Sequence, residues 1–174
     1  MLVKVLRLGH RVGRDKRATT HLFLAARAFG AVEGFLSGET DSNLTNSVNS
    51  LSNSWGGDFK VSYVKNWRKL VREFNGKIVH LTMYGIPVQN CVKKIGAGSD
   101  LLVIVGGAKV PSDVYELADY NVSITTQPHS EIAALSVFLD KLFDGKELLL
   151  KFPNAQKKIV PKKNGKKVLK YSEK

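Results

Sequence analysis

Five consecutive apolar residues at 101–105 (LLVIV) are the feature that most restricts what this chain can fold into. A strand that is apolar at every position has both faces covered, which is typical of the interior of a parallel sheet with helices on each side. Other strand patterns, at residues 2–8, 31–36, 59–64, 78–82 and 120–124, alternate with helix patterns across short loops. The sequence therefore predicts an α/β fold with a mainly parallel sheet flanked by helices.

Helix boundaries follow from capping residues and glycines. We expect a polar loop over residues 9–17, followed by a helix that Thr19 or Thr20 caps and Gly30 ends. The Ser- and Asn-rich residues 40–55 fit either a polar helix from Asp41 or a loop. Four later helices are expected at 66–74, at 87–95, from Pro111, and at 130–143.

The charge of this chain lies mainly at its two ends. The 174 residues carry a net charge of +12, of which residues 1–30 contribute +6 and residues 151–174 contribute +8. So basic a protein attracts polyanions, either nucleic acid or an anionic membrane surface. With 43% hydrophobic residues the chain can bury a core, which excludes a disordered basic tail. We expect one domain over residues 1–150 and a Lys-rich extension over residues 151–174.

Several classes of protein are disfavoured. No run approaches the ~18 apolar residues of a transmembrane helix, and arginines stand where a secretory signal has its apolar core. We therefore expect a cytoplasmic protein without a membrane partner. The lone Cys91 excludes an intramolecular disulfide and a cysteine zinc cluster, and we interpret it as a small core residue. The four histidines lack metal-ligand spacing, so no metal is expected.

Loops at the carboxyl ends of the strands are where a parallel sheet binds its ligand. The glycines at 106 and 107 allow close backbone approach, although the loop is neither a Walker A loop nor a GxGxxG fingerprint. Residues 125–131 (TTQPHSE) form the densest polar cluster of the chain. Helix capping explains Ser130 and Glu131 but leaves the Gln-Pro-His part unexplained.

Arginines are concentrated in the expected loop near the N-terminus. They are either phosphate-binding residues or a solvated charged loop, and they include Arg7, Arg11, Arg14 and Arg17. Arg27 differs, because it lies inside an apolar helical segment. It is either a surface residue with a buried stem or a charge placed near a substrate.

These motifs together resemble one family over roughly residues 3–144. They are RLGHR at 7–11, RD at 14–15, TTH at 19–21, RAFG at 27–30, HLTMYG at 80–85, ADYNV at 118–122 and QPHSE at 127–131. The set is similar to the archaeal tRNA cytidine-56 2′-O-methyltransferases of the SPOUT class. The resemblance implies 2′-O-methylation of cytidine 56 in the T-loop of tRNA, and a SPOUT-type fold with a C-terminal trefoil knot, a rare exception to unknotted chains.

The resemblance also implies a homodimer with the active site at the subunit interface, tRNA as partner, and S-adenosylmethionine as cofactor. Three loops would bind the cofactor, through Leu81, then Gly106, Gly107, Ala108, Lys109 and Val110, and then Ile124, Thr125, Thr126, Gln127, Pro128, His129, Ser130 and Glu131.

Similar SPOUT enzymes have an arginine at the place of Arg27, six residues after an asparagine that is His21 here. That arginine is often assigned as the base that takes the ribose 2′-OH proton, sometimes from the other subunit, and we expect Arg27 to be essential. A guanidinium has a pKa above ~12 and hardly ever loses its proton, so holding a phosphate and stabilising the developing alkoxide suits Arg27 better than acting as base. His21 is a rival base that can work near neutral pH. The base itself is left open.

Two other functions fit the sequence. One is a SPOUT ribose methyltransferase that acts on another RNA nucleotide, and the other is a non-catalytic basic RNA-binding module. A nucleotide-binding enzyme is disfavoured, because the glycine loop lacks the Lys and Ser/Thr pair of a phosphate loop. The Lys-rich extension is interpreted as auxiliary tRNA affinity, with a purely solubilising end as the alternative.

Overall fold

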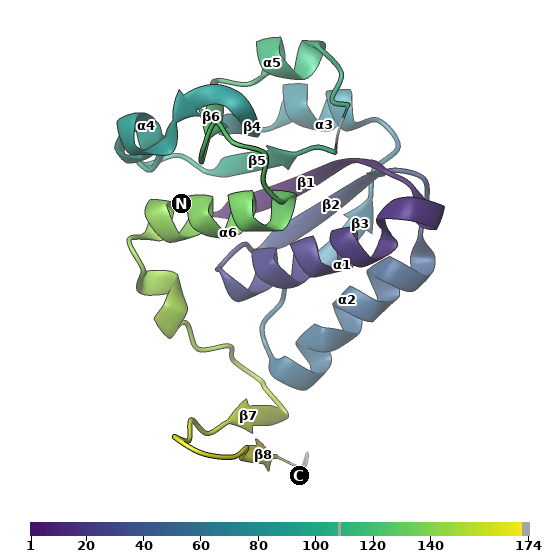
Figure 1. Cartoon of the computed structure of the whole chain (residues 1–174). Helices are drawn as coiled ribbons and strands as arrows, with labels where there is room; N and C mark the ends of the chain where they lie inside the picture. Colours follow the sequence, from purple (N-terminus) through teal and green to yellow (C-terminus); the bar gives the residue numbers. More distant parts are fainter. Residues whose placement is uncertain (108, 172–174) are drawn as a thin grey trace.

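The computed structural model describes residues 1–107 and 109–171. Its main sheet has six strands, all parallel, in the order β3-β2-β1-β5-β4-β6 (Figure 1). The strands are β1 (Val3–His10), β2 (Glu33–Gly38), β3 (Lys60–Tyr63), β4 (Lys77–Pro87), β5 (Leu101–Val105) and β6 (Tyr120–Ser123). The predicted α/β fold with a parallel sheet is confirmed.

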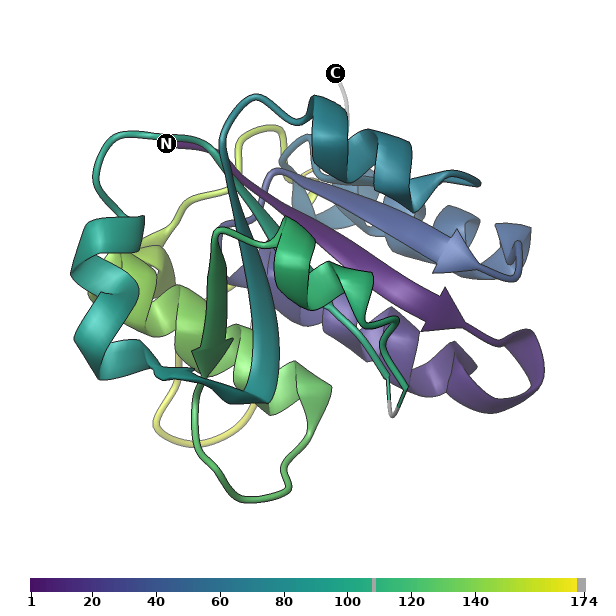
Figure 2. The same cartoon turned by 90° about the horizontal axis from the view of Figure 1, so that it is seen from above.

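Helices cover both faces of this sheet. One face packs on α1 (Val12–Ala28), α2 (Ser42–Trp55), α4 (Val88–Ile95) and α6 (Glu131–Phe143). The other face packs on α3 (Trp67–Glu73) and α5 (Asp113–Leu117), and α5 lies across the strands in the view from above (Figure 2). Parallel strands buried on both sides need such double cover.

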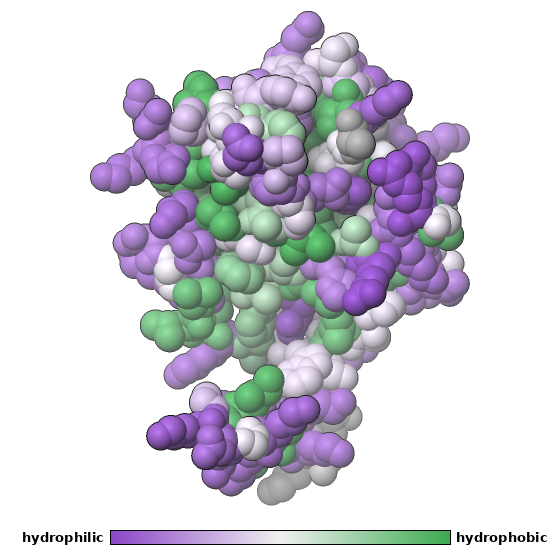
Figure 3. Space-filling view, in the orientation of Figure 1, coloured by the Kyte–Doolittle hydropathy of each residue, from purple (hydrophilic) through white to green (hydrophobic). Residues whose placement is uncertain are grey.

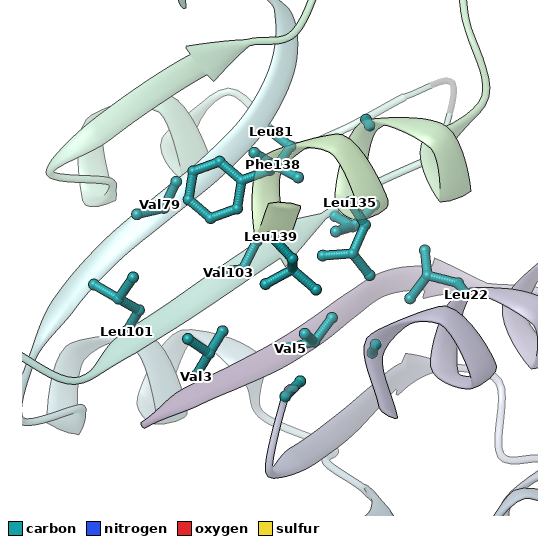
Figure 4. Close-up of a cluster of buried hydrophobic side chains, with 14 of the residues drawn as sticks. Val3, Val5, Leu22, Val79, Leu81, Leu101, Val103, Leu135, Phe138 and Leu139 are labelled. Carbon is teal, nitrogen blue, oxygen red and sulfur yellow. The ribbon is translucent and has the colours of Figure 1, made fainter. Parts of the chain in front are cut away.

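The core follows from the alternation of side chains along the central strands. Val3 and Val5 of β1 point to the face that α1 and α6 cover, while Leu6 and Leu8 point to the other face. Figure 4 shows these two residues on the same side of the sheet as Leu135, Phe138 and Leu139 of α6, with Phe138 next to Val79 of β4. All five residues of β5 are buried, as their continuous apolar pattern predicted.

Helix α1 begins earlier than predicted. The expected loop over residues 9–17 is wrong, because the chain turns at Gly9 (φ +67°) and becomes helical from Val12. Thr19 is therefore no cap: it is fully buried in the middle of the helix, where its hydroxyl meets other buried polar groups. The helix ends at Ala28, and Gly30 (φ +89°) follows in the left-handed region, as expected.

Other capping predictions are confirmed. Residues 42–55 form a helix rather than a loop, and the Asp41 carboxylate accepts a hydrogen bond from the Leu44 amide at 2.9 Å. Asn66 caps α3 and Ser130 caps α6 in the same way. Cys91 is buried on α4, and this burial raises the pKa of its thiol. It is the core residue that the sequence indicated.

The C-terminal residues form a short 3-10 helix, η1 (Lys146–Leu149), and an antiparallel hairpin of β7 (Lys157–Ile159) and β8 (Val168–Lys170). The connection between them crosses to α2, where the Gly57 amide donates a hydrogen bond to the Pro153 carbonyl at 2.8 Å. Among the described residues, no helix is long and apolar enough to cross a lipid bilayer.

Candidate functional site

A pocket of about 370 Å³ opens at the carboxyl ends of β4, β5 and β6. Three loops surround it: the end of β4, the turn after β5, and the segment between β6 and α6. Its walls are formed by Arg14, His80, Leu81, Thr82, Met83, Tyr84, Val105, Gly106, Gly107, Val110, Tyr115, Val122, Ile124, His129, Ser130, Glu131 and Ala134. Chain segments that are far apart in sequence thus meet where a parallel sheet binds its ligand.

The turn after β5 depends on glycine. A Cβ at Gly106 would collide with the side chain of Val110, so the loop can fold back on itself only without a side chain there. At Gly107 an added Cβ would meet only ordinary van der Waals contacts, so packing does not require a glycine there. As a glycine in the pocket wall, Gly107 presents its backbone to the pocket without a side chain.

His80 is a buried polar residue in the pocket wall. Its Nδ1 lies 2.9 Å from Asn121 Oδ1, and Asn121 Nδ2 donates to the Tyr115 carbonyl at 2.9 Å. Because Asn121 Oδ1 can only accept, His80 Nδ1 carries the proton. Burial lowers the pKa of His80, which favours the neutral imidazole, and its Nε2 has no hydrogen-bond partner among the described residues.

The start of α6 supplies most of the polar groups. Ser130 Oγ accepts a hydrogen bond from the Ala133 amide at 3.1 Å, and Glu131 occupies the first turn. His129 Nδ1 lies 2.7 Å from the Gln127 carbonyl oxygen, which can only accept. Nδ1 of His129 is therefore the protonated nitrogen, and Nε2 keeps its lone pair.

The predicted cofactor residues divide into two groups. Eight of them line the pocket, namely Leu81, Gly106, Gly107, Val110, Ile124, His129, Ser130 and Glu131. Five others lie in the same loops but not in the pocket wall, namely Lys109, Thr125, Thr126, Gln127 and Pro128, and Ala108 lies outside the described residues. Sequence reasoning missed His80 and Tyr115 as wall residues. The pairing of His80 with Asn121 across β4 and β6 depends on the strand order, which the sequence did not predict.

The N-terminal arginines do not act as one group. Arg7 is a core residue at 2% exposure that forms an ion pair with Glu131, so its interpretation as part of an RNA-binding loop is wrong. Arg14 lines the pocket from the first turns of α1, while Arg11 and Arg17 are exposed there. Burial would raise the pKa of Asp15, but the hydrogen bond from Arg11 and the neighbouring arginine charges lower it.

Arg27 and His21 do not line this pocket. Arg27 follows Arg14 by thirteen residues on α1, which places it about 20 Å farther along the helix axis. Its Nη2 donates to the Gly56 carbonyl at 2.5 Å, and partial burial lowers its pKa. His21 is exposed on the same helix. Within one chain these two predicted catalytic residues are therefore outside the pocket, and a role for Arg27 would require the pocket of a second copy.

No three His, Cys, Asp or Glu side chains are grouped as metal ligands in the part of the chain that the structure describes. The charged groups at the pocket come from Arg14, Glu131 and the neighbouring Arg7.

Comparison with known proteins identifies the family. A family model described as tRNA ribose 2′-O-methyltransferase, aTrm56, matches residues 55–169. The tRNA (cytidine(56)-2′-O)-methyltransferase of Thermococcus kodakarensis is 52% identical over 174 residues, with 97% of each chain covered. The enzyme of the same name from Methanocaldococcus jannaschii is 53% identical, again with 97% of each chain covered.

Solved structures confirm the predicted SPOUT-type fold. The crystal structure of an RNA 2′-O ribose methyltransferase has a TM-score of 0.62 and 14% identity, covering 86% of this chain and 57% of that one. The SpoU methyltransferase AviRb from Streptomyces viridochromogenes, in complex with AdoMet, has a TM-score of 0.58 and 15% identity, covering 84% and 58%. The chain thus spans a little over half of each. The trefoil knot stays a prediction.

Because the family model covers more than half of the chain, and full-length relatives share about half of its residues, this chain belongs to the tRNA ribose 2′-O-methyltransferase family.

Proposed function

We propose that this protein methylates the ribose 2′-oxygen of cytidine 56 in tRNA, with S-adenosylmethionine as methyl donor, in the cytosol. The observation that carries the proposal is the 52% identity with a tRNA (cytidine(56)-2′-O)-methyltransferase over 97% of both chains. Because this identity extends along nearly the whole chain, we expect the pocket and the surface around it to bind the same substrate.

The chemistry of the pocket fits S-adenosylmethionine. Leu81, Val105 and Ile124 supply apolar wall for a flat ring, and bare backbone at Gly107 allows close approach. Glu131 places a carboxylate at the pocket, where it offers an opposite charge to a cationic ligand. When bound, S-adenosylmethionine supplies a methyl group on a positively charged sulfur that needs no further activation.

The protein must therefore hold the 2′-hydroxyl in line and remove one proton. His129 is suited to the proton transfer, because its Nδ1 proton is engaged by the Gln127 carbonyl, which leaves Nε2 of the neutral ring as the nitrogen that can accept a proton. It also lines the pocket, whereas His21 does not. We therefore assign the base to His129 and retain His21 as the rival that the sequence named.

Arg14 is suited to hold the phosphate beside the reacting ribose. Its side chain lines the pocket and is 61% exposed, so it can reach a ligand at the rim. A guanidinium grips phosphate oxygens bidentately and keeps its charge while negative charge develops on the ribose oxygen. Arg27 can take this role only toward the pocket of a second copy.

A homodimer is part of the proposal. Apolar residues lie exposed on α6, on η1 and directly after η1, where Figure 3 shows hydrophobic side chains gathered. They are Val137, Leu148, Leu149 and Leu150, and Leu149 has 83% of its surface exposed. A patch of this kind is typical of a protein interface. Sedimentation of the protein and of the Leu149→Asp variant tests the proposal, which requires a dimer that the variant weakens.

Incubation with tritiated S-adenosylmethionine and an unmodified tRNA transcript tests the function. We expect label in 2′-O-methylcytidine at position 56, and no label in a transcript with 2′-deoxycytidine at that position, because the accepting oxygen is missing. Label in a base, or at another ribose, would contradict the proposal. Absence of transfer together with absence of S-adenosylmethionine binding would favour a non-catalytic RNA-binding protein, because such a protein has no reason to bind the cofactor.

A further inference from the structure

Arg7 is a buried charge in the middle of the main sheet. In the sheet, Arg7 pairs with Leu36 of β2 on one side and with Val105 of β5 on the other. The side chain is 2% exposed and extends toward the face that α1 and α6 cover, where it meets Thr19 and Glu131. A guanidinium removed from water is unfavourable unless polar or charged groups meet it. These contacts engage Nε and Nη2, whereas Nη1 is buried with no hydrogen-bond partner among the described residues.

Arg7 forms an ion pair with Glu131 and faces Gly107. Both Glu131 and Gly107 line the pocket. Arg7 Nη2 lies 3.1 Å from Glu131 Oε2. A Cβ built on Gly107 would lie 3.7 Å from Arg7 Nη2 and 3.7 Å from Glu131 Oε1, so the turn after β5 faces this ion pair. Arg7 itself is absent from the pocket wall among the described residues.

A second set of contacts holds the guanidinium through groups other than Glu131. Arg7 Nε donates to Thr19 Oγ1 at 3.4 Å, and the same hydroxyl lies 3.0 Å from His10 Nδ1. His10 Nε2 in turn lies 3.5 Å from Asp41 Oδ2. All these groups except Glu131 are nine-tenths buried or more. The chain of contacts ties the guanidinium to α1 and to the start of α2.

We propose that Arg7 is a positioning residue for the cofactor pocket, which sets the Glu131 carboxylate and the Gly106–Gly107 turn at the geometry that binds the cationic part of S-adenosylmethionine. The inference rests on the proposed function for the identity of the ligand. It replaces the interpretation of Arg7 as an RNA contact. Two of the three pocket loops then share one buried anchor, and Thr19 maintains its orientation.

Calorimetric binding of S-adenosylmethionine to the full chain tests this role, with Arg7→Met, Thr19→Val and Glu131→Gln as variants. Removing one partner of a desolvated charge pair costs about a factor of ten or more, so we expect Arg7→Met and Glu131→Gln, which each break the Arg7–Glu131 ion pair, to raise the Kd at least about tenfold. The variant with both Arg7→Met and Glu131→Gln should have a Kd no more than about threefold above that of Glu131→Gln alone, because Arg7 acts through Glu131. Arg72→Met on α3, an exposed arginine, is the matched control and should bind normally.

Two further measurements separate positioning from other roles. If Arg7→Met does not fold, Thr19→Val retains the shape of the core and should still raise the Kd by about threefold, because it removes the long 3.4 Å hydrogen bond from Arg7 Nε and acts on Glu131 only through Arg7. The salt dependence of tRNA binding should be unchanged in Arg7→Met, since a lost phosphate contact would lower its slope by about one. Additive effects of Arg7→Met and Glu131→Gln, or a lowered salt slope, would overturn the inference. Because cofactor binding is measured without RNA, this result is independent of which nucleotide is methylated.

Discussion

The phenyl ring of Phe152 lies over the guanidinium of Arg27, with 4.5 Å between the ring centroid and Arg27 Cζ. The neighbouring Pro153 carbonyl accepts a hydrogen bond from Gly57, and the Gly56 carbonyl accepts one from Arg27. The first residues of the C-terminal extension are thereby packed against the last turn of α1 and the end of α2. The hairpin beyond them is largely exposed.

A chain ending at residue 150 should be less stable than a chain ending at residue 155. The shorter chain lacks Phe152 and the Pro153 carbonyl, whose contacts are together worth about 1–3 kcal/mol. Urea unfolding of the two chains measures the difference, and Phe152→Ala in the full chain should reproduce part of it. Equal stabilities would support the predicted domain boundary at residue 150.

The hairpin lysines should increase the affinity for tRNA without affecting methyl transfer. Residues 157–170 contain seven lysines and lie away from the pocket lining. Each phosphate contact that is lost lowers the salt slope of binding by about one. We expect the chain ending at residue 155 to bind tRNA more weakly, with a smaller slope and an unchanged kcat at saturating tRNA. A slope equal to that of the full chain would mean that the hairpin only aids solubility.

Arg14→Ala should lower kcat by about 100-fold or more, the usual effect of removing one group that stabilises developing charge. Affinity for S-adenosylhomocysteine should change little. Arg27→Ala is the comparison: it removes the contacts to Gly56 and Phe152 and should lower stability. If the homodimer brings Arg27 to the pocket of the partner subunit, the variant should also lose methyl transfer while cofactor binding stays largely intact. Unchanged turnover in a well-folded Arg27→Ala variant would end the assignment of Arg27 to the reaction.

The sheet and most helices could be predicted because their signals are local. The five apolar residues of β5 and the caps Asn66 and Ser130 act within a few residues of the elements they define. The start of α1 could not be predicted, because the polar residues of its first turns resemble a loop and the turn before it depends on Gly9 at positive φ. The burial of Arg7 could not be predicted for a different reason. Its ionic partner Glu131 is 124 positions away, and no periodicity indicates that a charged residue is buried.

His129→Gln should lower kcat by about 100-fold or more and remove the rise of kcat with pH that a histidine base produces. Glutamine keeps a polar side chain of similar size but accepts no proton in this range. The exposed His21→Gln is the matched control, and its kcat and pH profile should be those of the unchanged protein. A flat profile in His21→Gln together with normal behaviour of His129→Gln would move the base to His21.

The stability of the protein should fall as the pH drops below about 6.5, and His80 should contribute to that fall. Burial lowers the pKa of His80 from its ordinary value of 6.5, although the hydrogen bond with Asn121 opposes the shift. Between the lowered pKa and 6.5 the unfolded chain binds the proton and the folded chain does not, so the contribution is complete above 6.5 and is lost as the pH falls. Thermal unfolding from pH 8 to pH 5 should therefore show a steeper drop in Tm for the unchanged protein than for His80→Gln. The exposed His21→Gln variant should keep the full drop, and an equally steep drop in His80→Gln would show that His80 contributes nothing to it.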